Sequence, residues 1–182
     1  GIKADWGATL NGIVDGMQYE FGLGRGSGQQ WHSAGTPYDF VGRVGTDPDQ
    51  GWWLGVSGFA GELYRPNGLI RRRRIGLDAG IEMGCWTLMG EFSGGDNDGD
   101  DALQFLGDLS WRDPQQQWFL YGQLQVNKQR SAAAGWFGTT QSKLGVEWAP
   151  DQHWTLSAQW VQNLEPAANG QRDALMQLQA RY

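Results

Sequence analysis

Most of this sequence alternates between apolar and polar residues, and tryptophans recur where the alternating segments meet short polar turns. Alternation over segments of about ten residues is the pattern of strands with one apolar and one polar face. Seven aromatic residues stand beside such turns, all on the apolar phase: Trp52, Trp86, Trp111, Trp118, Trp148, Trp154 and Tyr182. Transmembrane β-barrels carry an aromatic girdle of this kind at a membrane interface. We therefore predict that these seven residues lie at one membrane interface.

The composition favours a barrel wall over an ordinary globular core. The chain has 182 residues, with 29 Gly and 11 Trp, and its mean hydropathy is -0.53. It has no apolar run of about 18 residues, so a transmembrane helix is excluded. In a barrel only every second residue faces lipid, so the average stays polar although one face is apolar.

Charge and cysteine content exclude other classes of protein. The net charge of -6 argues against nucleic acid as a partner, because phosphate binding needs a basic face. The single cysteine, Cys85, excludes an internal disulfide framework and a multi-cysteine metal site. We expect no cofactor.

The spacing of the segments predicts an all-β, antiparallel, up-and-down transmembrane β-barrel that fills residues 1–182 as a single domain. About ten strands can be counted from Met17 onward by alternation. They are expected at 17–23, 38–45, 52–63, 75–83, 86–92, 103–111, 118–127, 136–148, 154–162 and 172–182. Residues 1–16 form either an additional strand or a periplasmic segment. An eleventh strand would make the number odd, which suggests part of a larger barrel.

Connection lengths predict the orientation. Turns beside the tryptophans are short, and we expect every other connection to be long, including 25–37, an acidic one at 94–101 and one at 128–135. Outer-membrane barrels have short periplasmic turns and longer outer loops. The tryptophan end and the C-terminus are therefore predicted to be periplasmic, in a bacterial outer membrane.

The polar phase predicts the lining of a pore. Its members are Glu20, Asp39, Arg43, Arg74, Asp78, Glu82, Glu91, Asp108, Tyr121, Gln123, Lys143 and Glu147. Acidic residues outnumber basic ones, which favours cations weakly. Glutamines and glycines on the same phase suit uncharged or hydroxylated solutes. We expect Glu82 and Glu91 to face each other across a hairpin, as part of a charged network rather than as a catalytic pair.

Three other groups of residues suggest binding or chemistry. Arg71 and Arg73 stand at the outer end of a strand, where they are either lipopolysaccharide ligands or a solvated basic rim. Asp96, Asp98 and Asp100 resemble a Ca²⁺ loop without its distal Glu, and a solvated acidic loop is the simpler interpretation. His32 and Ser33 lie in a glycine-rich loop that lacks triad geometry, so we predict no enzymatic activity.

Four stretches resemble the C-terminal part of Gram-negative porins, in particular the phosphate-selective-porin-like group. They are "GMQYEFGLGRGSG", "YDFVGRVGTDPDQGWWLGVSGFAGEL", "RIGLDAGIEMGCWTLMGEFSGG" and "SKLGVEWAPDQHWTLSAQWVQN". The resemblance implies a barrel of the sixteen-strand class, often trimeric, that passes small solutes. A terminal aromatic such as Tyr182 resembles the feature that the barrel assembly machinery reads. A phosphate path needs a row of Arg or Lys, and the predicted acidic lumen departs from it.

These observations favour a passive channel for small hydrophilic solutes, either general or weakly cation-preferring. The alternative is a plugged barrel that serves as an anchor or receptor through its outer loops. A soluble β-protein that stacks sugars on tryptophan would not explain why the tryptophans gather at one end of the apolar phase.

Overall fold

The computed structural model describes residues 7–25, 38–65, 68–131, 135–151, 154–165 and 174–181. One short 3-10 turn, η1 Pro48–Gln50, interrupts a chain of strands. The strands are β1 Gly7–Val14, β2 Met17–Gly24, β3 Asp39–Thr46, β4 Trp52–Arg65, β5 Gly68–Met83, β6 Trp86–Asn97, β7 Asp100–Arg112, β8 Trp118–Ser131, β9 Gly135–Trp148, β10 Thr155–Asn163 and β11 Ala174–Arg181. Within these ranges no helix has the length and hydropathy that a membrane crossing requires.

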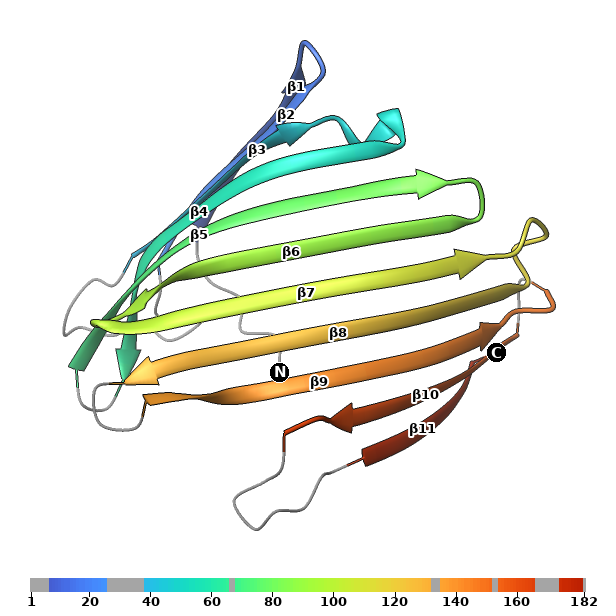
Figure 1. The fold of residues 1–182 in the computed structure, drawn as a ribbon. Coiled ribbons are helices and arrows are strands. Elements are labelled where there is room, and N and C mark those ends of the chain that lie inside the picture. Colours follow the sequence, from blue (N-terminus) through green and yellow to red (C-terminus); the bar gives the residue numbers. More distant parts are fainter. Residues whose placement is uncertain are drawn as a thin grey trace.

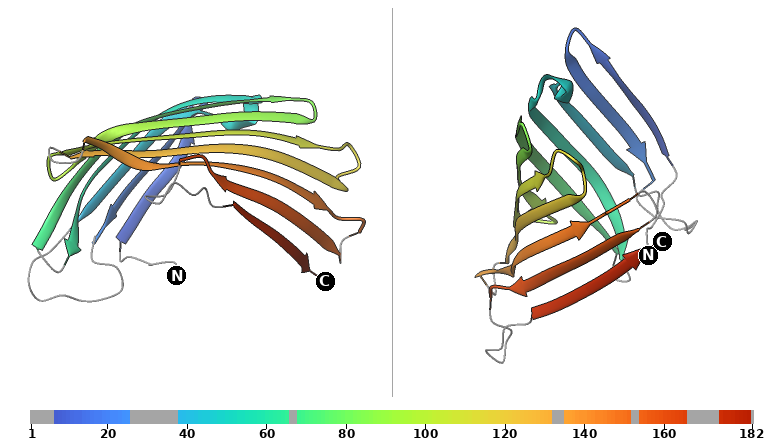
Figure 2. Two further views of the ribbon diagram at one scale, coloured as in Figure 1. Left: turned by 60° about the horizontal axis from the view of Figure 1, so that its bottom comes forward. Right: turned by 90° about the vertical axis from the view of Figure 1, so that its right-hand side faces the viewer.

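All eleven strands form one antiparallel sheet, in which each strand pairs with its neighbours in the sequence. Figure 1 shows the strands side by side in chain order, and Figure 2 shows the sheet curled into an open arch with β1 and β11 at its edges. The predicted all-β, antiparallel, up-and-down fold is confirmed. Among the described residues no pairing joins β1 to β11, so the sheet is not closed.

Residues 7–14, for which two interpretations were open, form the edge strand β1. Its register with β2 runs from the pair Gly7 and Gly24 to the pair Val14 and Met17. Because the strands are antiparallel and eleven in number, β1 and β11 run in the same direction.

The two faces of the sheet follow the period of two in the sequence. On β5 the side chains of Ile75, Leu77 and Ile81 are exposed on the convex face, whereas the alternate residues Gly76 and Asp78 are more shielded on the concave face. Large exposed apolar side chains cover much of the convex face, and Ala102 is the one hydrophobic residue among those described that is fully buried. The sheet therefore has no core of its own and exposes an apolar outer surface.

The convex face carries an apolar band along each long strand. On β5 the convex-face residues are apolar from Ile75 to Met83, and Arg73 and Arg71 follow toward the other end. This stretch of nine residues is within the range of about 9–11 residues that a tilted transmembrane strand needs. The strands continue beyond it.

The prediction that every connection opposite the tryptophan end is long was wrong for three of them. β4 and β5 are joined by residues 66–67, β6 and β7 by 98–99, and β8 and β9 by 132–134. The expected connections 94–101 and 128–135 are therefore mostly strand. The hairpins keep their ladders above the apolar band, where both phases are polar and the alternation disappears from the sequence. Asp98 and Gly99 turn the β6–β7 hairpin with φ of 56° and 93°.

Candidate pore-lining face

The tryptophans meet at one end of the convex face. Trp86 lies opposite Trp111 with ring centroids 6.5 Å apart, and Trp118 stacks on Trp148 at 5.9 Å. Trp52 begins β4, and Trp154 immediately precedes β10. Tyr182 lies outside the described residues. The membrane-interface role of this set remains a prediction.

A second aromatic position near the opposite end was missed. Trp136 lies on the convex face, and the guanidinium of Arg130 sits 5.9 Å from its ring centroid. Arg130 also forms an ion pair of 3.2 Å with Asp101. Trp136 and Trp148 are separated by about 40 Å along β9 at 3.3 Å per residue. The even spacing of these two tryptophans was the signal in the sequence that pointed to this position.

All the residues predicted to line a pore share the concave phase. The register pairs Glu20 with Arg43, Asp78 with Glu91, and Asp108 with Gln123. The strand pairings place the other members of the set on the same face. They are Asp39, Arg74, Glu82, Tyr121, Lys143 and Glu147. Their transport role remains a prediction.

Two further arginines lie on this face outside the predicted lining set, and for one of them, Arg72, this agrees with the expected alternation of the guanidinium groups along 71–74. Arg72 stacks over Phe59, with 5.1 Å from the guanidinium carbon to the ring centroid, and Arg112 stacks over Phe119 at 4.9 Å. Arg72 lies two residues from Arg74 on β5, and Arg112 lies four residues from Asp108 on β7. An even spacing on one strand places two side chains on the same face, so the alternation in the sequence predicts both positions.

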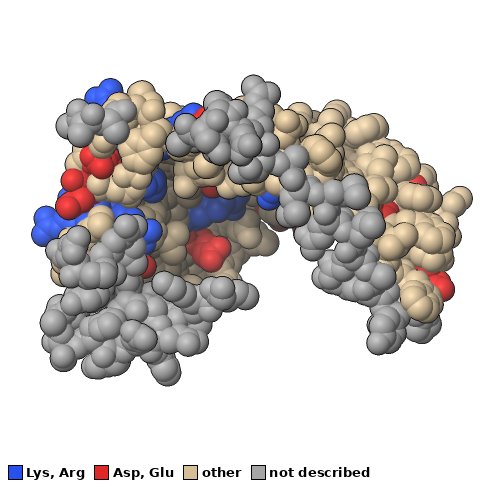
Figure 3. Space-filling model, turned by 90° about the horizontal axis from the view of Figure 1, so that it is seen from below, with Lys and Arg blue, Asp and Glu red and all other residues tan. Residues whose placement is uncertain are grey.

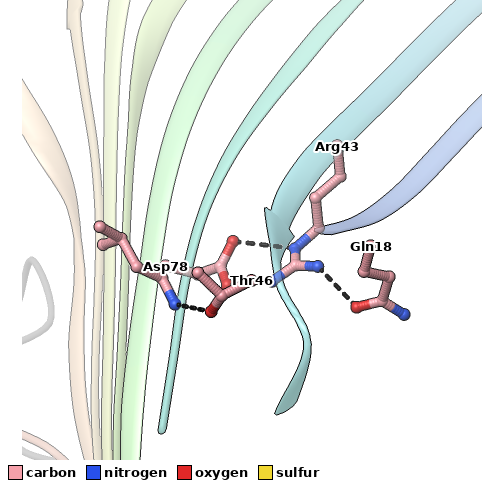
Figure 4. Close-up of polar contacts among 5 residues, drawn as sticks. Gln18, Arg43, Thr46 and Asp78 are labelled. Carbon is pink, nitrogen blue, oxygen red and sulfur yellow. Dashed lines mark hydrogen bonds and ion pairs between the residues drawn. The ribbon is translucent and has the colours of Figure 1, made fainter. Parts of the chain in front are cut away.

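An ion pair spans three strands of the concave face (Figure 4). From β3, Arg43 donates through Nε to Asp78 Oδ1 at 3.0 Å and through Nη2 to Asp78 Oδ2 at 2.5 Å, while Nη1 donates to Gln18 Oε1 at 3.1 Å. Such a two-pronged contact fixes the orientation of the guanidinium plane. The pair crosses β4 above Gly55, where an added Cβ would lie 2.6 Å from both Arg43 Nη2 and Asp78 Oδ1.

The expected pairing of Glu82 with Glu91 was wrong. The register sets Glu82 opposite Thr87 and Glu91 opposite Asp78. The cause is the tight turn at residues 84–85, which makes Met83 and Trp86 the first pair of the hairpin. The two carboxylates therefore lie at different heights on the wall.

Near the end opposite the tryptophans, Arg74 is bound to the wall. Its Nη1 donates to the carbonyl oxygens of Arg73 at 2.9 Å and Asp96 at 2.7 Å, and its Nη2 donates to Asn97 Oδ1 at 2.7 Å. Figure 3, which looks into the hollow of the arch, shows Lys, Arg, Asp and Glu side chains gathered toward this end.

Several concave-face carboxylates have no direct partner. Within the described part of the chain, no hydrogen bond or ion pair involves the side chains of Glu82, Glu91, Asp108 or Glu147. Lys143 is likewise unpaired there. Of the concave-face cations, Arg43 is neutralised by Asp78. Arg72, Arg74 and Arg112 also lie on this face and form no ion pair among the described residues, so unpaired charges of both signs line it.

The strands β6 to β10 present a different concave surface, rich in amides. Tyr121 donates to Gln159 Oε1 at 3.1 Å, and Gln141 Nε2 donates to Asn163 Oδ1 at 3.1 Å. A hollow of about 270 Å³ lies on this surface between β6 and β8. Its polar lining comprises Glu91, Ser93, Gln104, Gln123, Gln125 and Asn127.

Arg71 and Arg73 lie on the convex face above the apolar band. Arg71 Nε is 3.5 Å from Glu62 Oε1, and the Arg71 side chain is 73% exposed. Arg73 lies opposite Asp96 in the register. Their binding to lipopolysaccharide remains a prediction.

The structure does not assemble the Ca²⁺ candidate. Asp96 shares the convex phase with Asp101, its register partner, whereas Asp100 pairs with Asn97 on the concave phase and accepts from Gln129 Nε2 at 3.4 Å. Asp98 stands at the turn between them. No group of three acidic, histidine or cysteine side chains among the described residues could hold a metal ion. His32, Ser33 and His153 lie outside the described residues.

No protein-family model matches the sequence, and no curated protein matches it. Among solved structures, the anion-selective porin from Comamonas acidovorans has the same fold, with a TM-score of 0.75 and 14% sequence identity. The alignment covers 96% of this chain and 58% of that porin chain, so this chain spans little more than half the length of the porin. The described chain thus has the fold of a porin-like β-barrel wall.

Proposed function

We propose that this chain forms the wall of an outer-membrane channel through which small hydrophilic solutes diffuse, with a weak preference for cations. The observation that carries the proposal is the opposition of the two faces, one apolar and one polar, on a sheet curled into an arch. An apolar convex face stabilises the sheet in lipid, and a polar concave face stabilises water beside it. In the proposed orientation the tryptophan end and the C-terminus are periplasmic.

The cation preference rests on the unpaired carboxylates. Fixed charges in a narrow passage with low-dielectric walls attract counter-ions, and paired charges contribute little to that field. Glu82, Glu91 and Asp108 are unpaired within the described residues. Of the cations on the same face, Arg43 is neutralised by Asp78, Arg74 is bound to the wall near the end opposite the tryptophans, and Arg72 and Arg112 each lie over an aromatic ring. The anion selectivity named for the Comamonas porin belongs to that protein.

The experiment is a reversal-potential measurement on the purified protein in planar bilayers under a salt gradient. The native pore should favour cations, and the triple variant Glu82→Gln, Glu91→Gln, Asp108→Asn should lower the cation-to-anion permeability ratio. The difference should shrink at about 1 M salt, where screening acts over roughly 3 Å. Anion preference of the native pore would contradict the selectivity. Zero conductance from folded protein would contradict the channel and favour a plugged anchor or receptor.

We also propose that Arg71 and Arg73 bind lipopolysaccharide phosphates. Both lie just beyond the apolar band on the convex face, and guanidinium groups match phosphate geometry. Added lipopolysaccharide should raise the melting temperature of the detergent-solubilised protein less when Arg71 and Arg73 are both replaced by Ser. Arg72→Ser, on the concave face between them, is the matched control and should leave the lipopolysaccharide effect unchanged.

A further inference from the structure

The concave hollow differs chemically from the rest of the face. Between β6 and β8 its lining contains four amide side chains, from Gln104, Gln123, Gln125 and Asn127, together with one serine and one carboxylate. Leu106 supplies an apolar patch among them. Its volume of about 270 Å³ is just below the range of about 300–1,000 Å³ typical of clefts for drug-sized ligands. It therefore suits one small solute rather than a polymer.

Three of these amides are not used by the fold. Within the described residues the side chains of Gln123, Gln125 and Asn127 make no hydrogen bond to the protein. Gln104 accepts only from Ser93 Oγ, at 3.3 Å. Most described amides elsewhere on the concave face are bound, as Gln18 is to Arg43 and Gln141 is to Asn163, each at 3.1 Å. The hollow therefore gathers unused donors and acceptors in one place.

The register explains why they gather. Glu91, Leu106 and Gln125 follow one another in a cross-strand row, and Gln104 lies opposite Asn127 in the next row. Register neighbours on one face have Cβ atoms about 5 Å apart, so a single solute can reach several of these side chains. Leu106 interrupts the polar row without filling the space above it.

The chemistry of this lining selects the class of solute. Amides offer donors and acceptors without charge, so they match hydroxyl groups, which also both donate and accept. The carboxylate of Glu91 can accept from hydroxyls and disfavours anions, and Leu106 can contact the C–H face of a ring. A simple ion gains little binding free energy here, because its interactions with neutral amides are no stronger than those it already makes with water.

We infer that this hollow is a binding subsite for a neutral polyhydroxylated solute the size of one hexose, held by Gln123, Gln125 and Asn127 within the lumen. The inference rests on the proposed function, because a subsite on the concave face acts in transport only if the lumen is open. The subsite would give the proposed channel a class of solute and a binding position, in addition to the charge preference proposed above.

The experiment measures glucose-dependent current reduction of the purified protein in planar bilayers. Glucose should reduce the current saturably, beyond its effect on bulk conductivity, whereas a polyethylene glycol of similar size should reduce it without saturation. In the double variant Gln123→Met, Gln125→Met the half-saturating glucose concentration should rise at least about ten-fold, since each lost neutral hydrogen bond is worth about five-fold. Methionine keeps the volume of glutamine and removes its amide.

Gln141→Met is the matched control, because Gln141 is the register neighbour of Gln125 on the same face but lies outside the hollow. It should leave glucose saturation unchanged. Saturation-transfer NMR of glucose with the detergent-solubilised protein gives a readout that needs no conduction. Conductance without saturable glucose binding would overturn the subsite and leave the channel standing. Glucose binding lost in the double variant, without conductance, would support the subsite and contradict the channel. Equal glucose affinity in the native protein and the double variant would overturn the assignment of these amides.

Discussion

The two faces of the sheet use glycine differently. On the concave face, side chains from neighbouring strands lie over the glycines: the Arg43 and Asp78 pair covers Gly55, and Tyr121 covers Gly145. On the convex face, an added Cβ at Gly58 would come no closer than 4.0 Å to another atom, and one at Gly90 no closer than 3.9 Å. Gly58 and Gly90 therefore lie under open space, whereas Tyr19 covers Gly12 and Phe21 approaches Gly42 on the same face.

This difference shows how one set of strands makes two surfaces. Concave side chains lie along the wall and bind one another, so they need strands without side chains beneath them. An aromatic ring laid over a cross-strand glycine also stabilises a sheet, as Tyr121 does over its register partner Gly145. On the convex face most large apolar side chains are exposed, so their energy depends more on the surrounding medium. We therefore expect the effect of a substitution on stability to depend on the proposed lipid contact on the convex face and on neighbouring side chains on the concave face.

The largest expected effect tests the assignment of faces. Leu144 lies on the convex face, between Gly122 and Trp160 in the register, within the apolar band. Leu144→Arg should cost roughly 2–4 kcal/mol near the bilayer midplane. Gln123→Arg, on the concave face at the same depth, should cost far less because the lumen is wet. Refolding titrations in lipid vesicles measure the free energy of unfolding of both variants. Equal losses of stability would show that the two faces are wrongly assigned.

A smaller effect tests the layer of concave side chains. Gly55→Ala should destabilise the sheet by about 1–3 kcal/mol, because its Cβ would overpack the Arg43 and Asp78 pair. Gly58→Ala, on the convex face of the same strand, has open space and should be neutral or slightly stabilising. Denaturant unfolding in detergent micelles compares the two variants. If Gly58→Ala lowered the free energy of unfolding as much as Gly55→Ala, the side chains over the concave face would not be what makes Gly55 necessary.

Much of this fold could be predicted from the sequence, because alternation reports directly which face a residue occupies. The concave positions of Asp78 and Lys143 follow from parity alone. Strand ends could not be read in the same way, because β6 and β7 continue into the polar stretch around Asp96, where both phases are hydrophilic. Cross-strand partners also depend on the turn, so Glu91 was matched with the wrong carboxylate. The free amides of the hollow depend on side-chain rotamers, for which the sequence carries no signal.

The smallest expected effect lies on the convex face beyond the apolar band. Glu165, just after β10, accepts hydrogen bonds from Lys128 Nζ and from Thr140 Oγ1, the latter at 2.6 Å. The bond from Lys128 is the main reason why the pKa of the Glu165 carboxyl lies below its ordinary value of 4.5, and the Thr140 bond adds to it. The same segment is tied to β9 by the Leu164 N–H, which donates to the Thr140 carbonyl at 2.7 Å.

The sign of the pH dependence follows from the lowered pKa. The unfolded carboxyl binds its proton near 4.5 and the folded one only at lower pH, so the stabilisation is complete above 4.5 and is lost as pH falls through the folded pKa. Hydrogen-exchange protection of the Leu164 amide should therefore fall as the pH is lowered from 4.5 through the folded pKa, after correction for intrinsic rates. In Glu165→Gln it should be lower at pH 6 and nearly independent of pH. The same pH dependence in both proteins would mean that Glu165 does not hold this segment against β9.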